Sequence, residues 1–276
     1  MPQRLTLREI QLAELDILLK VTEYFDSHGI YYILCSGTML GAVRHKDFIP
    51  WDDDIDMYIF RDDFERLKAL ASDGRDIPEG VKFLVPGDEG HIYPYIKAVN
   101  PSIIADDGKI TGTSHLWADI FPLDHFPDDT REHKKYLRKA IFLQAVLSVA
   151  TYTWPHLKER GYTRTLKGKI RVLAAKIICT LMGGYRNIAL RLDRMARELD
   201  GRYKSSKHVG DGAWPNGMND YFLVEWVKPA IKHEFEGHEF NIPARYDDFL
   251  THFYGDYMTP PPEDKRQTHY LKAYRQ

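Results

Sequence analysis

The chain has 276 residues, a formal net charge of −2 and 43% hydrophobic residues, enough for one large domain or two small ones. The near-neutral charge and the lack of a basic tail argue against a nucleic-acid-binding surface. The opening MPQRLTLREI lacks the apolar core of a signal peptide, and no run reaches the roughly 20 apolar residues of a membrane span, so we expect a cytoplasmic protein. Cys35 and Cys179 lie far apart in apolar stretches and are expected to be buried hydrophobic side chains.

Helix and strand patterns alternate through the first hundred residues. Thr6 and Glu9 have the spacing of a capping box, and the stripe behind them predicts a helix over 6–28 that ends near Gly29. The order of these elements predicts an α+β (mixed α/β) domain built on one small sheet. Further patterns predict strands at 30–35, 54–60, 81–85 and 93–99, and helices at 38–44 and 62–71.

The segment 34–60, LCSGTMLGAVRHKDFIPWDDDIDMYIF, carries the strongest chemical signal. Asp54 and Asp56 are one residue apart in a run typical of a strand, where residues i and i+2 point to the same side. Two carboxylates on one face repel each other unless a cation lies between them, and hard oxygen ligands favour Mg²⁺ or Mn²⁺. We therefore predict that Asp54 and Asp56 bind a divalent metal ion.

Other interpretations of the acidic run stay open. Most Asp clusters are solvated loops, although here Ile55, Met57 and Ile59 alternate with polar residues and indicate one buried face. Asp52 and Asp53 are second choices as ligands, because they precede the strand and could instead cap or orient their neighbours.

The Ser36-Gly37-Thr38 turn, just before a predicted helix, is a candidate phosphate site. Its backbone N–H groups could bind phosphate oxygens, because Gly37 can adopt a positive φ. Arg44 and Lys46 follow the turn, and the planar guanidinium of Arg44 could hold two phosphate oxygens. Both residues could equally be ordinary surface cations.

Two further cations are candidates for phosphate binding. Lys97, in YPYIKAV, alternates with two tyrosines and could reach a phosphate from a sheet face, or could be a solvated strand lysine. His45 is a weaker candidate, and the histidine spacings do not suggest a zinc site.

A third carboxylate is predicted at Asp119. It lies in HLWADIFPLD, which predicts a strand over 116–121 that ends at Pro122, and its strand face also carries two aromatic residues. An Asp in such surroundings is costly to bury without a partner, so it either binds the metal or accepts an N–H hydrogen bond. Asp124, just beyond the proline, is the alternative ligand.

The region from about 130 to 200 changes in character, since strand signals largely vanish and helices are predicted at 134–150, 166–182 and 185–199. The runs 141–154 and 170–182 are unusually apolar. We favour core helices, with docking onto a membrane or a lipid-linked acceptor as the alternative. The intervening cations would suit anionic headgroups or a plain solvated face: Lys158, Arg160, Arg164, Lys167, Lys169 and Arg171.

Three regions are expected to form one compact unit. Residues 1–130 would form the catalytic core, 131–204 a helical region, and 205–276 an aromatic-rich segment that completes the active-site or acceptor side. The Pro260–Pro262 run predicts a rigid turn or a short polyproline piece.

The sequence resembles the LicD family, bacterial phosphocholine transferases related to the fukutin-type proteins. The resemblance is carried by SGTMLGAVRHKDFIPWDDDIDMYI, by WADIFPLD and by FEGHEFNIPARYDDFLTHFYGDYM, and it covers residues 8–130 and 205–270. It implies a nucleotidyltransferase-like small sheet with flanking helices, here with a helical insertion. It also implies three metal-binding carboxylates, matched by Asp54, Asp56 and Asp119, after a turn that reads Ser-Gly-Thr instead of the usual Gly-Gly or Gly-Ser.

The activity implied by the resemblance is metal-assisted transfer of phosphocholine, or of a ribitol or glycerol phosphate, from a CDP-activated donor such as CDP-choline. A hydroxyl of a cell-surface glycan precursor (teichoic acid, lipopolysaccharide or capsule) would attack, and CMP would leave. The acceptor could be lipid-linked, with a peripheral contact at the inner face of the membrane. Aromatic faces would bind choline by cation–π contacts, with Trp51, Tyr58, Tyr93, Tyr95, Trp117 and Trp214 as candidates.

Two rival functions remain. A nucleotidyltransferase that transfers NMP from an NTP would use the same carboxylates, so only its products distinguish it. A non-catalytic nucleotide-binding protein is disfavoured, because all three candidate carboxylates are present.

Overall fold

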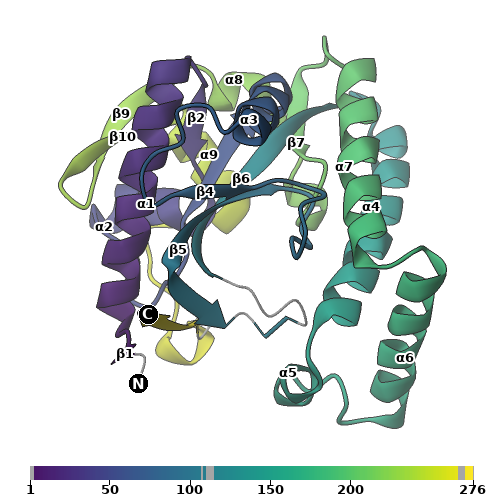
Figure 1. Cartoon of the computed structure of the whole chain (residues 1–276). Coiled ribbons are helices and arrows are strands. Elements are labelled where there is room, and N and C mark those ends of the chain that lie inside the picture. The colour runs from purple at the N-terminus through teal and green to yellow at the C-terminus, as the bar shows by residue number, and fades with distance from the viewer. Residues whose placement is uncertain (1–2, 107, 110–114, 267–270, 276) are drawn as a thin grey trace.

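The structure is a computed structural model that describes residues 3–106, 108–109, 115–266 and 271–275 (Figure 1). The strands are β1 Gln3–Arg4, β2 Tyr32–Leu34, β3 Asp56–Phe60, β4 Lys82–Leu84, β5 Ile96–Asp106, β6 His115–Phe126, β7 His208–Asp211, β8 Phe222–Leu223, β9 Ala230–Phe235, β10 His238–Pro243 and β11 Lys272–Arg275. The helices are α1 Leu7–His28, α2 Ser36–His45, α3 Arg61–Asp73, α4 Thr130–Thr151, α5 Trp154–Glu159, α6 Leu166–Leu181, α7 Tyr185–Arg202, α8 Val224–Val227 and α9 Tyr246–Tyr254, with 3₁₀ turns at Gly217–Asn219 and Glu263–Lys265.

One mixed sheet organises the molecule, which confirms the predicted α+β class. Its strand order is β1-β11-β5-β6-β3-β2, with β4 beside β5, β7 beside β6 and β8 beside β7, while β9 and β10 form a separate hairpin. Strands β3 and β6 are parallel, and β2 and β5 run antiparallel to them. Figure 1 shows this sheet between α1 on one side and the helices α4 and α7 on the other.

Helix α1 begins and ends as its sequence predicts. Thr6 accepts a hydrogen bond from the Glu9 backbone while the Glu9 side chain accepts one from the Thr6 backbone, so the capping box is complete. Gly29 closes the helix in the left-handed conformation, with φ 62°. The stripe that includes Ile17 and Phe25 is fully buried in the main core.

The predicted end of β6 at Pro122 is wrong, because the strand continues through the proline. The backbone N–H of Asp119 donates to Ile55 on the β3 side, at 2.8 Å, so the nitrogen three residues later faces the opposite neighbour. There the pairing with β5 has ended at Ile120 and the pairing with β7 begins at Leu123. The donor that proline lacks therefore falls where no ladder bond is needed.

The helical region also corrects the sequence-based interpretation. Helix α5 lies between the predicted helices and was not foreseen. The preferred core role of the second apolar run is wrong for one face of α6, where Ile170 and Leu173 are 59% and 60% exposed. Val172, Ala175 and Cys179 on the opposite face are buried. No helix within the described ranges is both long and apolar enough to span a bilayer.

The C-terminal segment supplies part of the main core and three strands of the sheet, β7, β8 and β11. Phe222, Phe235, Phe240 and Phe249 are buried in the same cluster as the residues of α1 and β3. Strand β11 pairs with both β1 and β5, so it ties the C-terminal segment to the N-terminal one.

Candidate active site

Three charged side chains form a row across the centre of the sheet. Asp56 of β3 pairs in register with Asp119 of β6, and Asp119 pairs with Lys97 of β5. Register partners project from the same face of a sheet, so the two carboxylates and the ammonium are neighbours. All three are nearly buried, and Lys97 Nζ lies 3.0 Å from Asp119 Oδ1.

This row lines a cavity of about 300 Å³. Ser36, from the first turn of α2, and Asp54, two residues before β3, line the same cavity. The structure therefore brings together the three predicted carboxylates with one residue of the predicted phosphate turn. Aromatic side chains form much of the remaining wall: Tyr58, Tyr93, Tyr95, Trp117, Phe121 and Trp214.

The carboxylates of the row repel one another. Burial raises the pKa of Asp56 well above its usual range, and the charges of Asp54 and Asp119 raise it further. Burial also raises the pKa of Asp119, although the Lys97 ammonium beside it acts in the opposite direction. A cation bound between these groups would relieve the repulsion and keep them ionised.

Glu14 is an additional buried acid that the sequence analysis missed. It is fully buried, and neither carboxyl oxygen has a hydrogen-bond partner among the described residues. Burial raises its pKa well above the usual range, and the charges of the Asp52–Asp54 run raise it further. The sequence did hold a signal, because Glu14 lies four residues from both Ile10 and Leu18 on the apolar face of α1.

The carboxylate oxygens of the cavity suit a hard divalent cation. Their positions, however, are not those of a formed metal site. Within the described ranges, no three Asp, Glu, His or Cys side chains converge closely enough to hold an ion. Asp119 is already paired with Lys97, so an ion there would compete with an ammonium. The excess of buried carboxylates over cations is the feature that favours such an ion.

The turn before α2 works differently from its prediction. The positive φ of the turn belongs to Ser36, at 48°, and not to Gly37. The Asp52 carboxylate lies against Gly37, so a Cβ atom at this position would require that carboxylate to move. Thr38 is buried, and its hydroxyl accepts a 2.9 Å hydrogen bond from the Asp56 backbone, which fixes the start of β3.

Arg44 and Lys46 lie at the opposite end of α2 and do not line the cavity. Arg44 donates to the Tyr257 carbonyl at 2.8 Å, and Lys46 pairs with Glu234 at 3.1 Å. His45 accompanies Arg44, whose Nε lies 3.4 Å from the imidazole Nδ1. The structure thus does not bring these three residues to the carboxylates.

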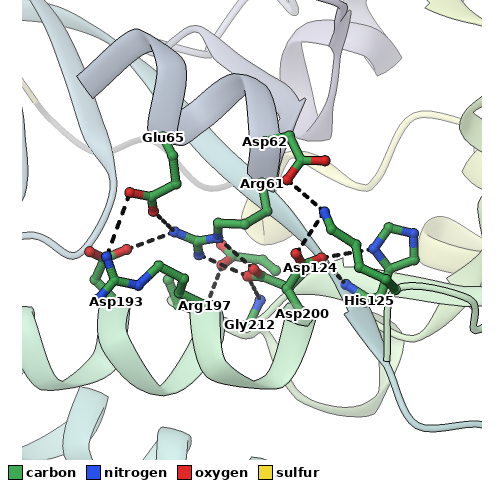
Figure 2. A network of polar contacts seen from close by, with 12 residues as sticks. Arg61, Asp62, Glu65, Asp124, His125, Asp193, Arg197, Asp200 and Gly212 are labelled. Carbon is green, nitrogen blue, oxygen red and sulfur yellow. Dashed lines mark hydrogen bonds and ion pairs between the residues drawn. The ribbon is translucent and has the colours of Figure 1, made fainter. Parts of the chain in front are cut away.

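The alternative third carboxylate, Asp124, belongs to another cluster. Both of its oxygens accept hydrogen bonds from the Arg61 guanidinium, at 2.7 and 3.0 Å, and Arg61 also pairs with Asp193 (Figure 2). Burial by itself lowers the pKa of a guanidinium, but these carboxylates outweigh it and raise the pKa of Arg61. Arg61 therefore joins α3 to β6 through Asp124 and to α7 through Asp193, while Asp119 faces the cavity.

The cavity contains an aromatic cage that already surrounds a cation. Lys97 Nζ lies 3.6 Å from the ring centroid of Trp117 and 4.5 Å from that of Tyr93. Trp214 packs edge-on against Tyr93 and Tyr95, which closes the wall around them. Trp51, by contrast, lies outside the cavity lining, and the Arg266 guanidinium packs over its ring.

The helical region forms the other end of the cavity, which the sequence analysis did not foresee. Tyr152, His156 and Arg160 line it together with Lys109. Lys109 Nζ lies 3.5 Å from the Tyr152 ring centroid, and Arg160 Cζ lies 4.8 Å from it. Nothing in the spacing of these residues indicates that they meet, because two loops and α5 bring them together.

Known proteins resemble this chain in its motifs and over its length. Residues 29–141 match the nucleotidyltransferase domain of the LicD/FKTN/FKRP family. The chain is 28% identical over 278 residues to the lipopolysaccharide cholinephosphotransferase LicD of Haemophilus influenzae, with 98% of each chain covered. A stretch of 50 residues is 44% identical to human ribitol 5-phosphate transferase FKRP, covering 18% of this chain and 10% of FKRP. A stretch of 48 residues is 49% identical to an uncharacterised protein of Rickettsia prowazekii, covering 17% of this chain and 18% of that one.

Proposed function

We propose that this protein transfers an alcohol phosphate to a glycan hydroxyl, because residues 29–141 match the nucleotidyltransferase domain of the LicD/FKTN/FKRP family. The proposed donor is a CDP-alcohol, in the first instance CDP-choline, and CMP leaves. The observation that carries the proposal is the pair of buried carboxylates, Asp56 and Asp119, in register on parallel strands at the cavity wall. The names of two relatives, a cholinephosphotransferase and a ribitol 5-phosphate transferase, support an alcohol phosphate as the transferred group.

Asp54, Asp56 and Asp119 are the residues that would hold Mg²⁺ or Mn²⁺. When bound, the ion neutralises charge that develops on the transferred phosphate and on the departing CMP. In this proposal Asp119 would also accept the proton of the attacking hydroxyl or orient its attack. Ser36, at the start of α2, offers a hydroxyl and a helix N-terminus to the donor phosphates.

The aromatic cage supports choline as the alcohol. Trp117 and Tyr93 already surround the Lys97 ammonium, and the same ring faces attract a quaternary ammonium. In this proposal Lys97 shifts toward the donor phosphates when choline enters the cage. Lys97 would thereby release Asp119 for the metal ion.

The proposal is tested by incubating the protein with MgCl₂, a glycan acceptor and one of CDP-choline, CDP-ribitol or CDP-glycerol, and measuring CMP. We expect acceptor-dependent CMP release with at least one donor, fastest with CDP-choline, and loss of release with EDTA. Pyrophosphate release from an NTP in place of CMP release would instead establish the nucleotidyltransferase alternative. The absence of both products under conditions where the protein is folded would refute the proposal.

A further inference from the structure

Helix α6 presents an apolar stripe to the outside of the molecule. Leu166, Ile170, Leu173, Ile177 and Leu181 recur every three or four residues, so they share one side of the helix. Their exposed fractions lie between 48% and 81%, which is unusual for five large aliphatic side chains on a single helix. The opposite side already packs inward through Val172, Ala175 and Cys179, so the exposed stripe is not needed to attach α6 to the protein.

Positive charge surrounds the stripe. Between Glu159 and Asp193 the chain has eight Lys and Arg residues and no Asp or Glu. Lys169 borders the stripe on one side of the helix, and Lys167 and Arg171 border it on the other. An apolar stripe flanked on both sides by cations is the pattern of a helix that lies in the plane of an anionic membrane surface.

Exposed aromatic residues flank the same region. Trp154 on α5 is 58% exposed, and Tyr162, in the connection between α5 and α6, is 42% exposed. Such amphipathic rings are favoured at the level of lipid headgroups, where one end is apolar and the other is hydrated. Both residues precede α6 and so place a polar–apolar boundary at its N-terminal end.

A groove between α4 and α6 adds a route toward the active site. It has a volume of about 550 Å³, and Phe142, Val146 and Ile178 contribute to its apolar walls. Lys167 and Arg171 line the same groove. Arg160 lines both this groove and the catalytic cavity, so the two are neighbours at that residue.

We propose that the outer face of α6 binds an anionic phospholipid bilayer, with the helix lying parallel to the membrane plane. The stripe Leu166–Leu181 enters the apolar boundary, and the flanking cations contact the headgroups. In Figure 1, α5 and α6 form the end of the molecule that is farthest from α1 in this view, so the bilayer contacts a surface distant from α1.

A second copy of the chain fits this face less well. A symmetric dimer would place each stripe against its own counterpart. The cations of one α6, Lys167, Lys169 and Arg171, would then face those of the other. Like charges at close range oppose association, whereas phosphate headgroups attract the same residues.

The docked orientation would give a lipid-linked acceptor a route to the active site, a step that rests on the proposed function. Arg160 connects the groove beside the bilayer to the catalytic cavity, so a lipid-linked acceptor could remain in the membrane while its glycan reaches Asp119. The ligand that would follow this route is an anionic phosphate joined to a hydrocarbon chain.

The test is co-sedimentation of the full chain with vesicles of phosphatidylcholine alone and of phosphatidylcholine mixed equally with phosphatidylglycerol. We expect binding to the mixed vesicles only, and loss of binding when salt rises from about 0.05 M to about 0.5 M. Leu173→Asp should weaken binding by at least about tenfold, because a leucine side chain that enters the bilayer is replaced by a charged one. Lys169→Glu should weaken it as well.

Matched controls come from elements outside the helical region. Leu12→Asp changes a leucine of α1 that is 47% exposed, and Lys82→Glu changes an exposed lysine of β4. Both variants should bind vesicles as the unmodified protein does. Circular dichroism and thermal unfolding of Leu173→Asp should match the unmodified protein, since Leu173 lies on the surface.

Several outcomes would overturn the inference. These are no binding to the mixed vesicles, equal losses for Leu173→Asp and Leu12→Asp, or a dimer that Leu173→Asp dissociates in sedimentation velocity. The assay contains neither donor nor acceptor. A failure of CMP release would therefore not contradict the membrane-binding inference. A failure of vesicle binding would not contradict the proposed transferase activity.

Discussion

Unbalanced buried charge is the main residue-scale property of the cavity. The charges of Asp54 and Asp119 act on both Asp56 and the buried Glu14, and Lys97 pairs with Asp119. Burying carboxylates without compensation costs several kcal/mol each, so a fold that keeps them together sacrifices stability at this place. Such a sacrifice is typical of sites whose charge is completed by a ligand.

Replacing one carboxylate should separate chemistry from stability. For Asp56→Asn we expect turnover to fall by at least about 10²-fold, because a charge that holds the cation is lost. The thermal midpoint should stay unchanged or rise, since repulsion among the remaining carboxylates decreases. CMP release and thermal unfolding measure the two effects. Asp16→Asn, at a half-exposed residue of α1, is the control. An Asp56→Asn variant with undiminished turnover would refute the metal role.

Gly37→Ala tests the contact between the α2 turn and the acidic run. The new Cβ atom would collide with the Asp52 carboxylate, so that this side chain must move beside Asp54 in the acidic run. We expect turnover to fall by about tenfold or more, because a small displacement at a catalytic group is costly. Gly201→Ala in α7 is the control, since its Cβ meets nothing within 4 Å. It should be neutral or stabilise by up to about 1 kcal/mol. Equal turnover in both variants would show that Asp52 does not depend on Gly37.

Asp220 provides a pH-dependent test of stability. Burial raises its pKa to about 7, so the folded state favours the protonated form. Its stabilising contribution is complete below the unfolded pKa near 4 and is lost as pH rises through 7, up to about 4 kcal/mol. Asp220→Asn does not titrate and should be more stable than the unmodified protein at pH 8, with little difference at pH 4. Urea unfolding at both pH values measures this, and parallel pH profiles would contradict the assignment.

At the scale of elements, the Arg61 cluster holds the helical region to the sheet. Arg61 of α3 contacts Asp124 of β6 and Asp193 of α7, and the Gly212 backbone also donates to Asp124 (Figure 2). His125 reaches Asp200 of α7 at 2.7 Å in the same view. Three elements that are far apart in the sequence are thus joined by buried charges.

Arg61→Met should leave the buried Asp124 without its cationic partner and leave Asp193 paired with Lys68 alone. We expect the free energy of unfolding to fall by about 3–5 kcal/mol, as for other broken buried pairs. Arg197→Met is the matched control, because Arg197 is half exposed and contacts Glu65 only at 3.8 Å. Its effect should stay below about 1 kcal/mol. Urea unfolding of both variants checks the difference, and similar losses would mean that burial of the Arg61 cluster is not decisive.

At the scale of the whole molecule, the main sheet and its core contain residues of both the N-terminal and the C-terminal regions. The C-terminal segment supplies β11 between β1 and β5, and its phenylalanines lie in the main core. We therefore expect one cooperative unfolding transition, with fluorescence and circular dichroism midpoints that coincide. A fragment of residues 1–204 should remain unfolded, because β5 and β6 would lose β11 and β7. A stable, cooperatively folding fragment would instead establish separate domains.

The sequence determined the local structure and the chemical type of the site. The capping box of α1, the strands around the acidic run and the buried cysteines follow from neighbouring residues and from period, which act over one or two turns. The sequence also predicted Asp54, Asp56 and Asp119 as site residues, because carboxylates in apolar surroundings favour an ion partner. All three line the same cavity.

The tertiary structure decided which charges share a cavity. Lys97 and Asp119 become neighbours through strand register, while Asp124 forms an ion pair with Arg61 of α3. Arg44 is adjacent to the turn in sequence, yet α2 carries it to the opposite end of a helix. The exposed face of α6 was also undecided, because an apolar run has the same pattern whether it is buried or interfacial. These outcomes depend on contacts between distant segments, which local propensity does not specify.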